Sequence, residues 1–256
     1  MPTFRRLPRL LLATVAFALP GHAAVVIHEY ALQGTLADNL GGSPLTGMGG
    51  QITALGYVFA ANQGLTLTSP LLNPAHYSLE FSFRFDDVNG YRKLVDFHDR
   101  VDDGGFYILN GALNFYPVIT ANTADFTPNT TFHVVLTRDG ASGIVNGYVN
   151  GQLRFTFNDT GPGATFTSTG NKVTFFADDF ATSQGEASGG SVNYIRVYNG
   201  ALTATEVGTL FATGAPSVVP EPRVVLLLAG GSLALLARRA GTEGRPGRPG
   251  RRPRDR

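Results

Sequence analysis

Hydrophobic and polar residues alternate one by one in two stretches of the chain, residues 79–85 and 132–137. In the first stretch, a leucine and three phenylalanines fall on one face of the extended chain. Such alternation with a period of two predicts β-strands with one buried face and one solvent-exposed face. The residues expected on the exposed face are Glu80, Ser82, Arg84, His133, Val135 and Thr137.

Further short runs are rich in aromatic and β-branched residues, and Asn-Gly pairs lie between many of them. We predict strands at residues 65–68, 93–97, 105–109, 112–116, 144–149, 152–157, 172–177 and 192–198. The pairs begin at Asn89, Asn110, Asn146, Asn150 and Asn199. Asn-Gly favours a type I′ hairpin turn because both residues tolerate positive φ, and the pairs at 110 and 150 give the strongest signals. This spacing predicts an all-β fold, an antiparallel two-sheet β-sandwich or jelly roll.

One short helix is predicted near the end of this domain, from Ala204 to about Phe211. Thr203 and Glu206 form the pattern of a capping box, in which a hydroxyl and a carboxylate each accept a hydrogen bond from a free backbone N–H group. We expect this helix to close the domain.

The N-terminal segment, residues 1–23, has the layout of a signal peptide. It contains three arginines, an apolar run at residues 10–19 and small residues at the expected cleavage site, Ala23 and Ala24. The apolar run is too short to cross a hydrocarbon core of roughly 30 Å as a stable helix. We therefore predict export, with cleavage after Ala23 or one residue later.

The C-terminal segment at residues 216–239 places two prolines, an apolar run at residues 224–237 and two arginines in that order. The prolines set an extended entry, and the arginines hold the end of a short transmembrane helix on the cytoplasmic side. The segment resembles the PEP-CTERM sorting signal of Gram-negative bacteria that produce exopolysaccharide. The resemblance implies recognition by an exosortase, a membrane transpeptidase that removes the helix, and a transient anchor in the inner membrane. Its residues are Val219, Pro220, Glu221, Pro222, Arg238 and Arg239.

Charge divides the chain into an acidic body and basic ends. Residues 240–256 contain six arginines and no apolar run, which predicts a disordered basic tail. Residues 24–222 carry eight lysines and arginines against seventeen aspartates and glutamates, a net charge of −9. An acidic body repels phosphate backbones, so we predict no nucleic-acid partner. The chain has no cysteine, which excludes disulfides and thiolate metal ligands.

The domain expected at residues 24–215 also resembles the concanavalin A-like, laminin-G-like jelly rolls. The resemblance covers about residues 25–212 and is carried by the stretch 77–85, the hairpin 147–151, and the run 192–202 followed by Glu206 and Val207. That family commonly ends in a strand of this form and a short helix led by Ala-Leu. The resemblance implies the same fold, a frequent calcium ion on the sandwich rim, and glycan binding on a concave face or on loops at one edge.

Adjacent aspartates are the candidate calcium ligands. Neighbouring carboxylates repel one another and become favourable when a hard divalent cation lies between their oxygens. Asp178 and Asp179 are the first choice, because the loop from Phe180 to Gly190 contains Glu186 and could fold back over them. The other pairs are Asp102 with Asp103 and Asp86 with Asp87. The alternative is that these are loop acids that favour turns.

Aromatic residues near polar loops are the candidate glycan ligands, since sugars stack on aromatic rings. The residues considered are Tyr91, His98, Tyr107, Tyr116 and Tyr148. The chain has no tryptophan, and aromatic residues in strands also serve as core residues. Both interpretations remain open for each tyrosine.

Glycoside hydrolysis is the least favoured function. The glucanases of the jelly-roll class carry Glu-x-Asp-x-x-Glu on one strand, and this motif does not occur in the sequence. Asp96 and Asp99 are the nearest pair, but residues three apart on a strand face opposite ways. We therefore predict a non-enzymatic, exported binding module associated with extracellular polysaccharide. The alternative is a purely structural protein of the cell surface or extracellular matrix without a ligand.

Overall fold

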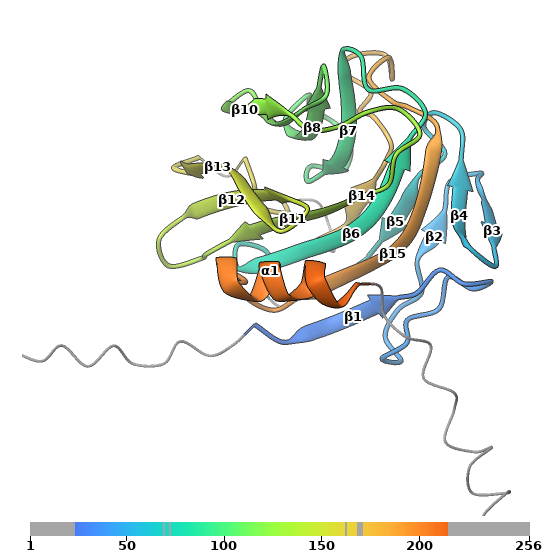
Figure 1. Ribbon diagram of the computed structural model, residues 1–256, viewed down its shortest axis with the longest axis horizontal. Coiled ribbons are helices and arrows are strands. Elements are labelled where there is room, and N and C mark those ends of the chain that lie inside the picture. The colour runs from blue at the N-terminus through green and yellow to red at the C-terminus, as the bar shows by residue number, and fades with distance from the viewer. Residues whose placement is uncertain (1–23, 69, 72, 162, 168–170, 215–256) are drawn as a thin grey trace, which may run out of the picture. The chain divides into compact units, whose positions relative to one another are not determined.

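The computed structural model describes residues 24–68, 70–71, 73–161, 163–167 and 171–214 of the chain. These residues form two antiparallel β-sheets and one helix (Figure 1). The predicted signal peptide, sorting segment, transmembrane helix and basic tail lie outside the described residues. Within the described ranges, no helix is long and apolar enough to span a bilayer.

One sheet, here called sheet A, contains eight strands among the described residues. Its order is β13 (Gln152–Asn158), β12 (Ile144–Val149), β11 (Phe132–Arg138), β6 (Tyr77–Phe85), β15 (Gly190–Tyr198), β4 (Gly56–Phe59) and β3 (Gln51–Thr53). β1 (Val26–Tyr30) pairs with the second half of β15, whose first half pairs with β4. The long β15 therefore joins the start of the domain to its end.

The other sheet, sheet B, contains seven strands in the described part of the chain. Its order is β10 (Ile119–Ala124), β9 (Ala112–Tyr116), β8 (Gly105–Leu109), β7 (Tyr91–Asp96), β14 (Val173–Phe175), β5 (Leu65–Leu67) and β2 (Thr46–Gly47). Every pairing in both sheets is antiparallel. The predicted fold class, an antiparallel two-sheet β-sandwich with one short helix, is confirmed.

Phenylalanines from both sheets fill the space between them. Phe176, directly after β14, lies 5.4 Å from Phe83 and 5.6 Å from Phe81 between ring centroids, and 5.2 Å from Phe59. Each of these four rings is at most 4% exposed. Burying one such side chain contributes roughly 1.5–3 kcal/mol to stability, so this aromatic cluster is a major term holding the sheets together.

The strongest predicted hairpins are present, and one Asn-Gly pair lies inside a strand. Asn110 and Asn150 have φ of 48° and 49° and join β8 to β9 and β12 to β13. In contrast, Asn146 and Gly147 lie inside β12, which confirms the strand predicted at residues 144–149 and shows that this Asn-Gly pair is not a turn. A Cβ on Gly147 would lie 2.5 Å from the ring of Phe155, which shows that this glycine serves close packing and not a turn.

The outer face of sheet A is less exposed than the alternation predicted. Glu80 and Thr137 are fully buried and His133 is 6% exposed, while Ser82 and Arg84 are partly exposed as expected. The physical reason is the helix α1 (Ala204–Thr213), which lies across this face (Figure 1). Buried with it in a second apolar cluster are Val135, Tyr148, Tyr198, Leu202 and Val207.

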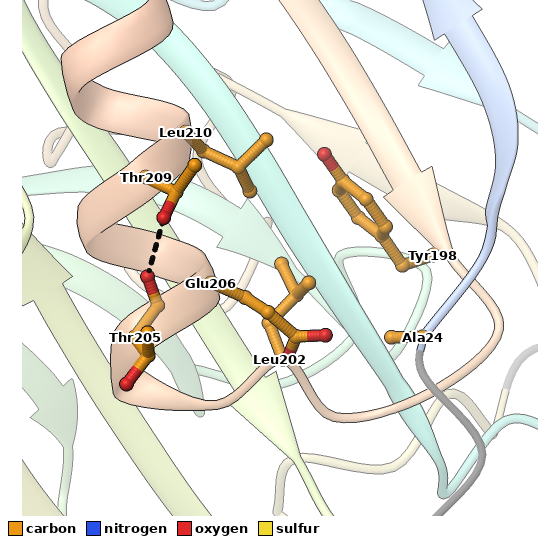
Figure 2. Close-up of a pocket in the computed structure, with 7 residues that line it drawn as sticks. All are labelled: Ala24, Tyr198, Leu202, Thr205, Glu206, Thr209 and Leu210. Atoms are coloured by element: carbon orange, nitrogen blue, oxygen red, sulfur yellow. Dashed lines mark hydrogen bonds between the residues drawn. The ribbon is translucent and has the colours of Figure 1, made fainter.

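Helix α1 begins as predicted. Thr203 is its N-cap and forms a complete capping box with Glu206. Figure 2 shows the cavity beside the helix, about 280 Å³ in volume, into which Leu202, Leu210 and Tyr198 project. The cavity is mostly apolar, and Ala24 lies on the opposite side from the helix.

Candidate functional site

The outer face of sheet B carries polar and aromatic residues, whereas its inner face carries core residues. On β8, Tyr107 faces outward while its neighbours Phe106 and Ile108 belong to the core. The loops at residues 97–104 and 176–189 border this face. They are held by backbone hydrogen bonds, from the N–H of Phe180 to the carbonyl of Arg100 (2.9 Å) and from the N–H of Lys93 to the carbonyl of Glu186 (2.8 Å).

Three carboxylates meet at this face and are here called the acid group: Asp103, Asp179 and Glu186. One oxygen of each lies within 4.8 Å of the others. Asp179 is fully buried, whereas Asp103 and Glu186 are partly exposed and give access from solvent. The acid group therefore consists of one buried carboxylate and two carboxylates that a ligand from solvent can contact.

Asp178 and Thr182 fold the loop that brings Glu186 back to the sheet. The N–H of Glu186 donates to Oδ2 of Asp178 (2.7 Å), and the hydroxyl of Thr182 donates to the same oxygen (3.0 Å). The N–H of Thr182 donates to Oδ1 of Asp179 (2.9 Å). The two adjacent aspartates thus act partly as acceptors that fix a turn, and only Asp179 contributes to the acid group.

A buried lysine lies under the acid group. Nζ of Lys93 is 2.6 Å from Oδ2 of Asp179 and 3.2 Å from Oδ2 of Asp96, and all three side chains are fully buried. The ammonium also lies 4.9 Å from the ring centroid of Tyr107. A buried lysine persists when it is paired and hydrogen-bonded, so Lys93 and Asp179 stabilise each other. Lys93 was expected only as the first residue of a strand, because nothing near it in sequence indicates the contact with Asp179.

Burial and neighbouring groups shift the pKa values of Glu186 and Asp179 in opposite directions. Burial raises the pKa of Glu186, and the neighbouring Asp103, Asp178 and Asp179 raise it further, to about 7. Burial also disfavours the charged form of Asp179, but the hydrogen bonds from Lys93 and Thr182, together with the charge of Lys93, outweigh burial and lower the pKa to about 2. The outer part of the group therefore carries negative charge that Lys93 does not fully compensate.

This surplus of negative charge fits a hard divalent cation. Ca²⁺ is bound by carboxylate and carbonyl oxygens, and the acid group offers three carboxylates on one side of Lys93. Of the six candidate aspartates, the structure brings Asp103 and Asp179 together, with Glu186 beside them. Asp102 lies in an exposed loop with an oxygen 2.8 Å from Nδ1 of His98, and it is not in the acid group.

Three of the candidate glycan residues form a tyrosine cluster next to the acid group. Ring centroids of Tyr91 lie 5.6 Å from Tyr107 and 5.5 Å from Tyr116. Tyr91 and Tyr116 are partly exposed, but Tyr107 is fully buried and offers no ring surface to a ligand. The hydroxyl of Tyr107 donates to the carbonyl of Asp103 (2.9 Å), which ties the cluster to the acid group.

The remaining candidates serve other roles. Tyr148 is 4% exposed and packs in the apolar cluster under α1. Asp86 contacts Arg84, and Asp87 contacts Arg92. Asp96 contacts Lys93 and Asp99 contacts Lys172. These carboxylates are already neutralised by cations of the chain.

The arrangement of strands and the sequence agree on a family. A laminin-G-type model of the concanavalin A-like lectin/glucanases superfamily matches residues 59–208. The chain belongs to this superfamily. The matched region runs from the end of β4 into α1, and it includes the acid group and the tyrosine cluster. A comparison with curated protein sequences gives no match.

Solved structures with the same fold come from several proteins. Domain 4 of AbnA, an extracellular arabinanase from Geobacillus stearothermophilus solved with arabinotriose, is 17% identical with a TM-score of 0.54, covering 73% of this chain and 98% of that chain. A Trypanosoma rangeli sialidase is 17% identical with a TM-score of 0.55, covering 76% of this chain and 33% of that chain. The botulinum neurotoxin serotype D binding domain is 13% identical with a TM-score of 0.53, covering 73% of this chain and 51% of that chain. At these identities the likeness shows the fold alone.

Proposed function

We propose that the chain is an exported module that binds extracellular polysaccharide on the outer face of sheet B. The observation that carries the proposal is the contact between the tyrosine cluster and the acid group through Tyr107 and Asp103. A sugar carries both C–H groups, which pack on aromatic rings, and hydroxyl groups, which donate hydrogen bonds to carboxylates. An aromatic surface beside carboxylates can therefore bind both kinds of group. Tyr91 and Tyr116 supply the ring surface, and Glu186 and Asp103 accept from hydroxyls.

The proposal includes a calcium ion held by Asp103, Asp179 and Glu186. Bound there, the ion supplies positive charge and open coordination positions for sugar oxygens. Support from the relatives is limited to what they bind: the arabinanase domain was solved with arabinotriose, and a botulinum neurotoxin serotype D ligand-binding domain was solved with N-acetylneuraminic acid. The site residues themselves come from the geometry of this chain.

Thermal unfolding with excess calcium and with chelator tests the ion. A ligand that binds only the folded state stabilises it by about 2.7 kcal/mol at a hundredfold excess over Kd, so the unfolding midpoint should rise by several degrees. Glu186→Gln should abolish the rise. Asp102→Asn is the matched control, because Asp102 is an acid of the same region that lies outside the acid group. If the unfolding midpoint is the same in calcium and in chelator, the acid group binds no calcium and its members only shape the loops.

Retention of the full chain on immobilised polysaccharide tests the glycan site. Tyr116→Ala removes a partly exposed ring of the tyrosine cluster and should reduce retention, whereas Phe180→Ala, at an exposed residue outside that cluster, should not. If no polysaccharide retains the protein, the alternative of a structural surface or matrix protein without a ligand takes its place.

Glycan cleavage is the second candidate, and one observation favours it. Two neighbouring carboxyls, Glu186 and Asp179, have pKa values of about 7 and about 2. Such a split is how glycosidases obtain a proton donor beside a charged carboxylate. Cleavage would release reducing ends from treated polysaccharide, and Glu186→Gln would stop their release. The absence of new reducing ends across the polysaccharides that are bound would exclude this function.

Export and sorting complete the proposal. The segment around Pro220, Glu221 and Pro222 is proposed to be the substrate of an exosortase-type enzyme, after a transient stay in the inner membrane. Replacing these three residues with alanine should block removal of the C-terminal segment and leave a longer, membrane-held protein on immunoblots of fractionated cells. If processing and location are unchanged, the segment is only an anchor.

A further inference from the structure

A second hollow surface lies on the outer face of sheet A, beyond the end of α1 that carries Phe211. It consists of two adjoining cavities of about 350 Å³ and about 200 Å³. Both are lined by Ser82, Thr131 and Tyr194. We call this combined surface the sheet A groove. Cavities that hold small ligands measure roughly 300–1,000 Å³, so the groove has room for one or two sugar units.

Two buried polar atoms of residues that line the groove lack partners. Nδ1 of His133 and Oδ1 of Asn193 have no hydrogen-bond partner among the described residues, and His133 is only 6% exposed. Nε2 of His133 lies 3.0 Å from a carboxylate oxygen of Glu80, which can only accept, so the proton sits on Nε2 and Nδ1 is an acceptor in the neutral ring. Oδ1 of Asn193 is likewise an acceptor, because the Nδ2 group donates to the carbonyl of Leu55 (3.0 Å). Buried polar groups are almost always hydrogen-bonded, so each of these acceptors can take a donor from water or from a ligand.

An aromatic ring joins the two cavities and is held in place. The hydroxyl of Tyr194 donates to the carboxylate of Glu80 (3.1 Å), and the guanidinium of Arg196 lies 5.3 Å from its ring centroid. Tyr194 is 3% exposed, so it forms a fixed wall of both cavities that needs no ordering when a ligand binds, and preorganisation of this kind favours binding.

We propose that the sheet A groove is a second saccharide site that takes a neutral, hydroxyl-rich ring. Hydroxyl groups supply the donors that the two unpaired acceptors require. A phosphate or carboxylate ligand would bring only further acceptors to the same atoms. The proposal rests on the proposed function in so far as it assigns the same ligand class, and it adds that the module is bivalent. Sites on opposite outer faces of the sandwich would let one molecule link two polysaccharide chains.

The test uses the full chain on an array of neutral oligosaccharides of arabinose, xylose, glucose, mannose and galactose, read in calcium and in chelator. The sheet A groove needs no metal, so retention in chelator should persist. Thr131→Trp fills the groove from an exposed position and should lower that retention at least about tenfold, as should Asn193→Ala. Thr123→Trp, at an exposed threonine of β10 in sheet B, is the matched control and should change it less than about twofold.

Each outcome separates the two sites. Retention in chelator that is lost in Thr131→Trp and Asn193→Ala, together with additional retention in calcium that is lost in Tyr116→Ala, supports both sites. Retention that requires calcium and Tyr116 overturns the groove and keeps the site on sheet B. Retention that depends on the groove variants but not on calcium or Tyr116 keeps the groove and overturns the sheet B site. If none of these sugars retains the protein, both the sheet A groove and the sheet B site are overturned as saccharide sites.

Discussion

Glu80 was expected on the solvent-exposed face of its strand, but its side chain is fully buried. Its carboxylate accepts hydrogen bonds from His133 Nε2 (3.0 Å) and from the hydroxyls of Tyr194 and Tyr198, and Arg196 lies 3.4 Å away. Burial raises the pKa of Glu80, but the hydrogen bonds from His133 and Tyr198 outweigh burial, and the pKa ends below its usual value. Alternation placed Glu80 on the correct face but could not show that side chains from β11 and β15 would enclose it.

Glu80→Ala should strongly destabilise the domain. The substitution leaves the guanidinium of Arg196 and the hydroxyls of Tyr194 and Tyr198 without their shared acceptor. Removing one partner from a buried charged network costs about 3–5 kcal/mol, which urea unfolding measures directly. Asp86→Ala removes an ion pair whose carboxylate is 53% exposed and should cost less than about 1 kcal/mol. Equal effects of the two substitutions would contradict this account.

Glu186 should make the metal-free domain less stable as the pH rises. Its pKa is raised from 4.5 to about 7 in the folded state, so the folded chain binds the proton more tightly than the unfolded chain does. Between these two values the folded state holds more protons, and stability therefore falls with increasing pH. The side chain is partly exposed, which limits the effect to the order of 1 kcal/mol.

The measurement for Glu186 is a comparison with Glu186→Gln in chelator at about pH 5 and about pH 7.5. The wild type should lose stability relative to the variant over this range, and calcium should reduce the loss because it binds the deprotonated carboxylate. A wild type that gains stability relative to the variant would show that Glu186 is stabilised as an anion by the chain itself.

At the scale of elements, local signals predicted the long strands and the hairpins, and they failed where pairing is decided by distant residues. β2 has two residues and β3 has three, so neither shows a period of its own. β1 exists because it pairs with β15, about 170 residues away in sequence. The position of Glu186 near the adjacent aspartates was anticipated, because the loop from Phe180 to Gly190 contains it. The pairing of Lys93 was not, because Asp179 lies 86 residues away in a loop.

Two glycines with opposite surroundings give a prediction at this scale. Gly208 in α1 has no atom within 4 Å of an added Cβ, so Gly208→Ala should stabilise the domain by up to about 1 kcal/mol through helix propensity. Gly147→Ala in β12 would place a methyl group 2.5 Å from Phe155 and 2.9 Å from Leu113. Overpacking of this kind costs typically about 1–3 kcal/mol. Urea midpoints should move in opposite directions, and a stabilising Gly147→Ala would refute the packing role of this glycine.

At the scale of the molecule, net charge selects among polysaccharides. Residues 24–222 carry a net charge of −9, and the buried lysine of the candidate site, Lys93, is already paired with Asp96 and Asp179. In chelator and at low salt, polygalacturonate and alginate should therefore be retained more weakly than neutral arabinan or xylan, because like charges repel at long range. At about 0.15 M salt the screening length falls to about 8 Å, and the difference should shrink. If the acidic polymers are instead retained better in chelator, the ligand lies on a cationic surface, and neither the sheet B site nor the sheet A groove is the place where polysaccharide binds.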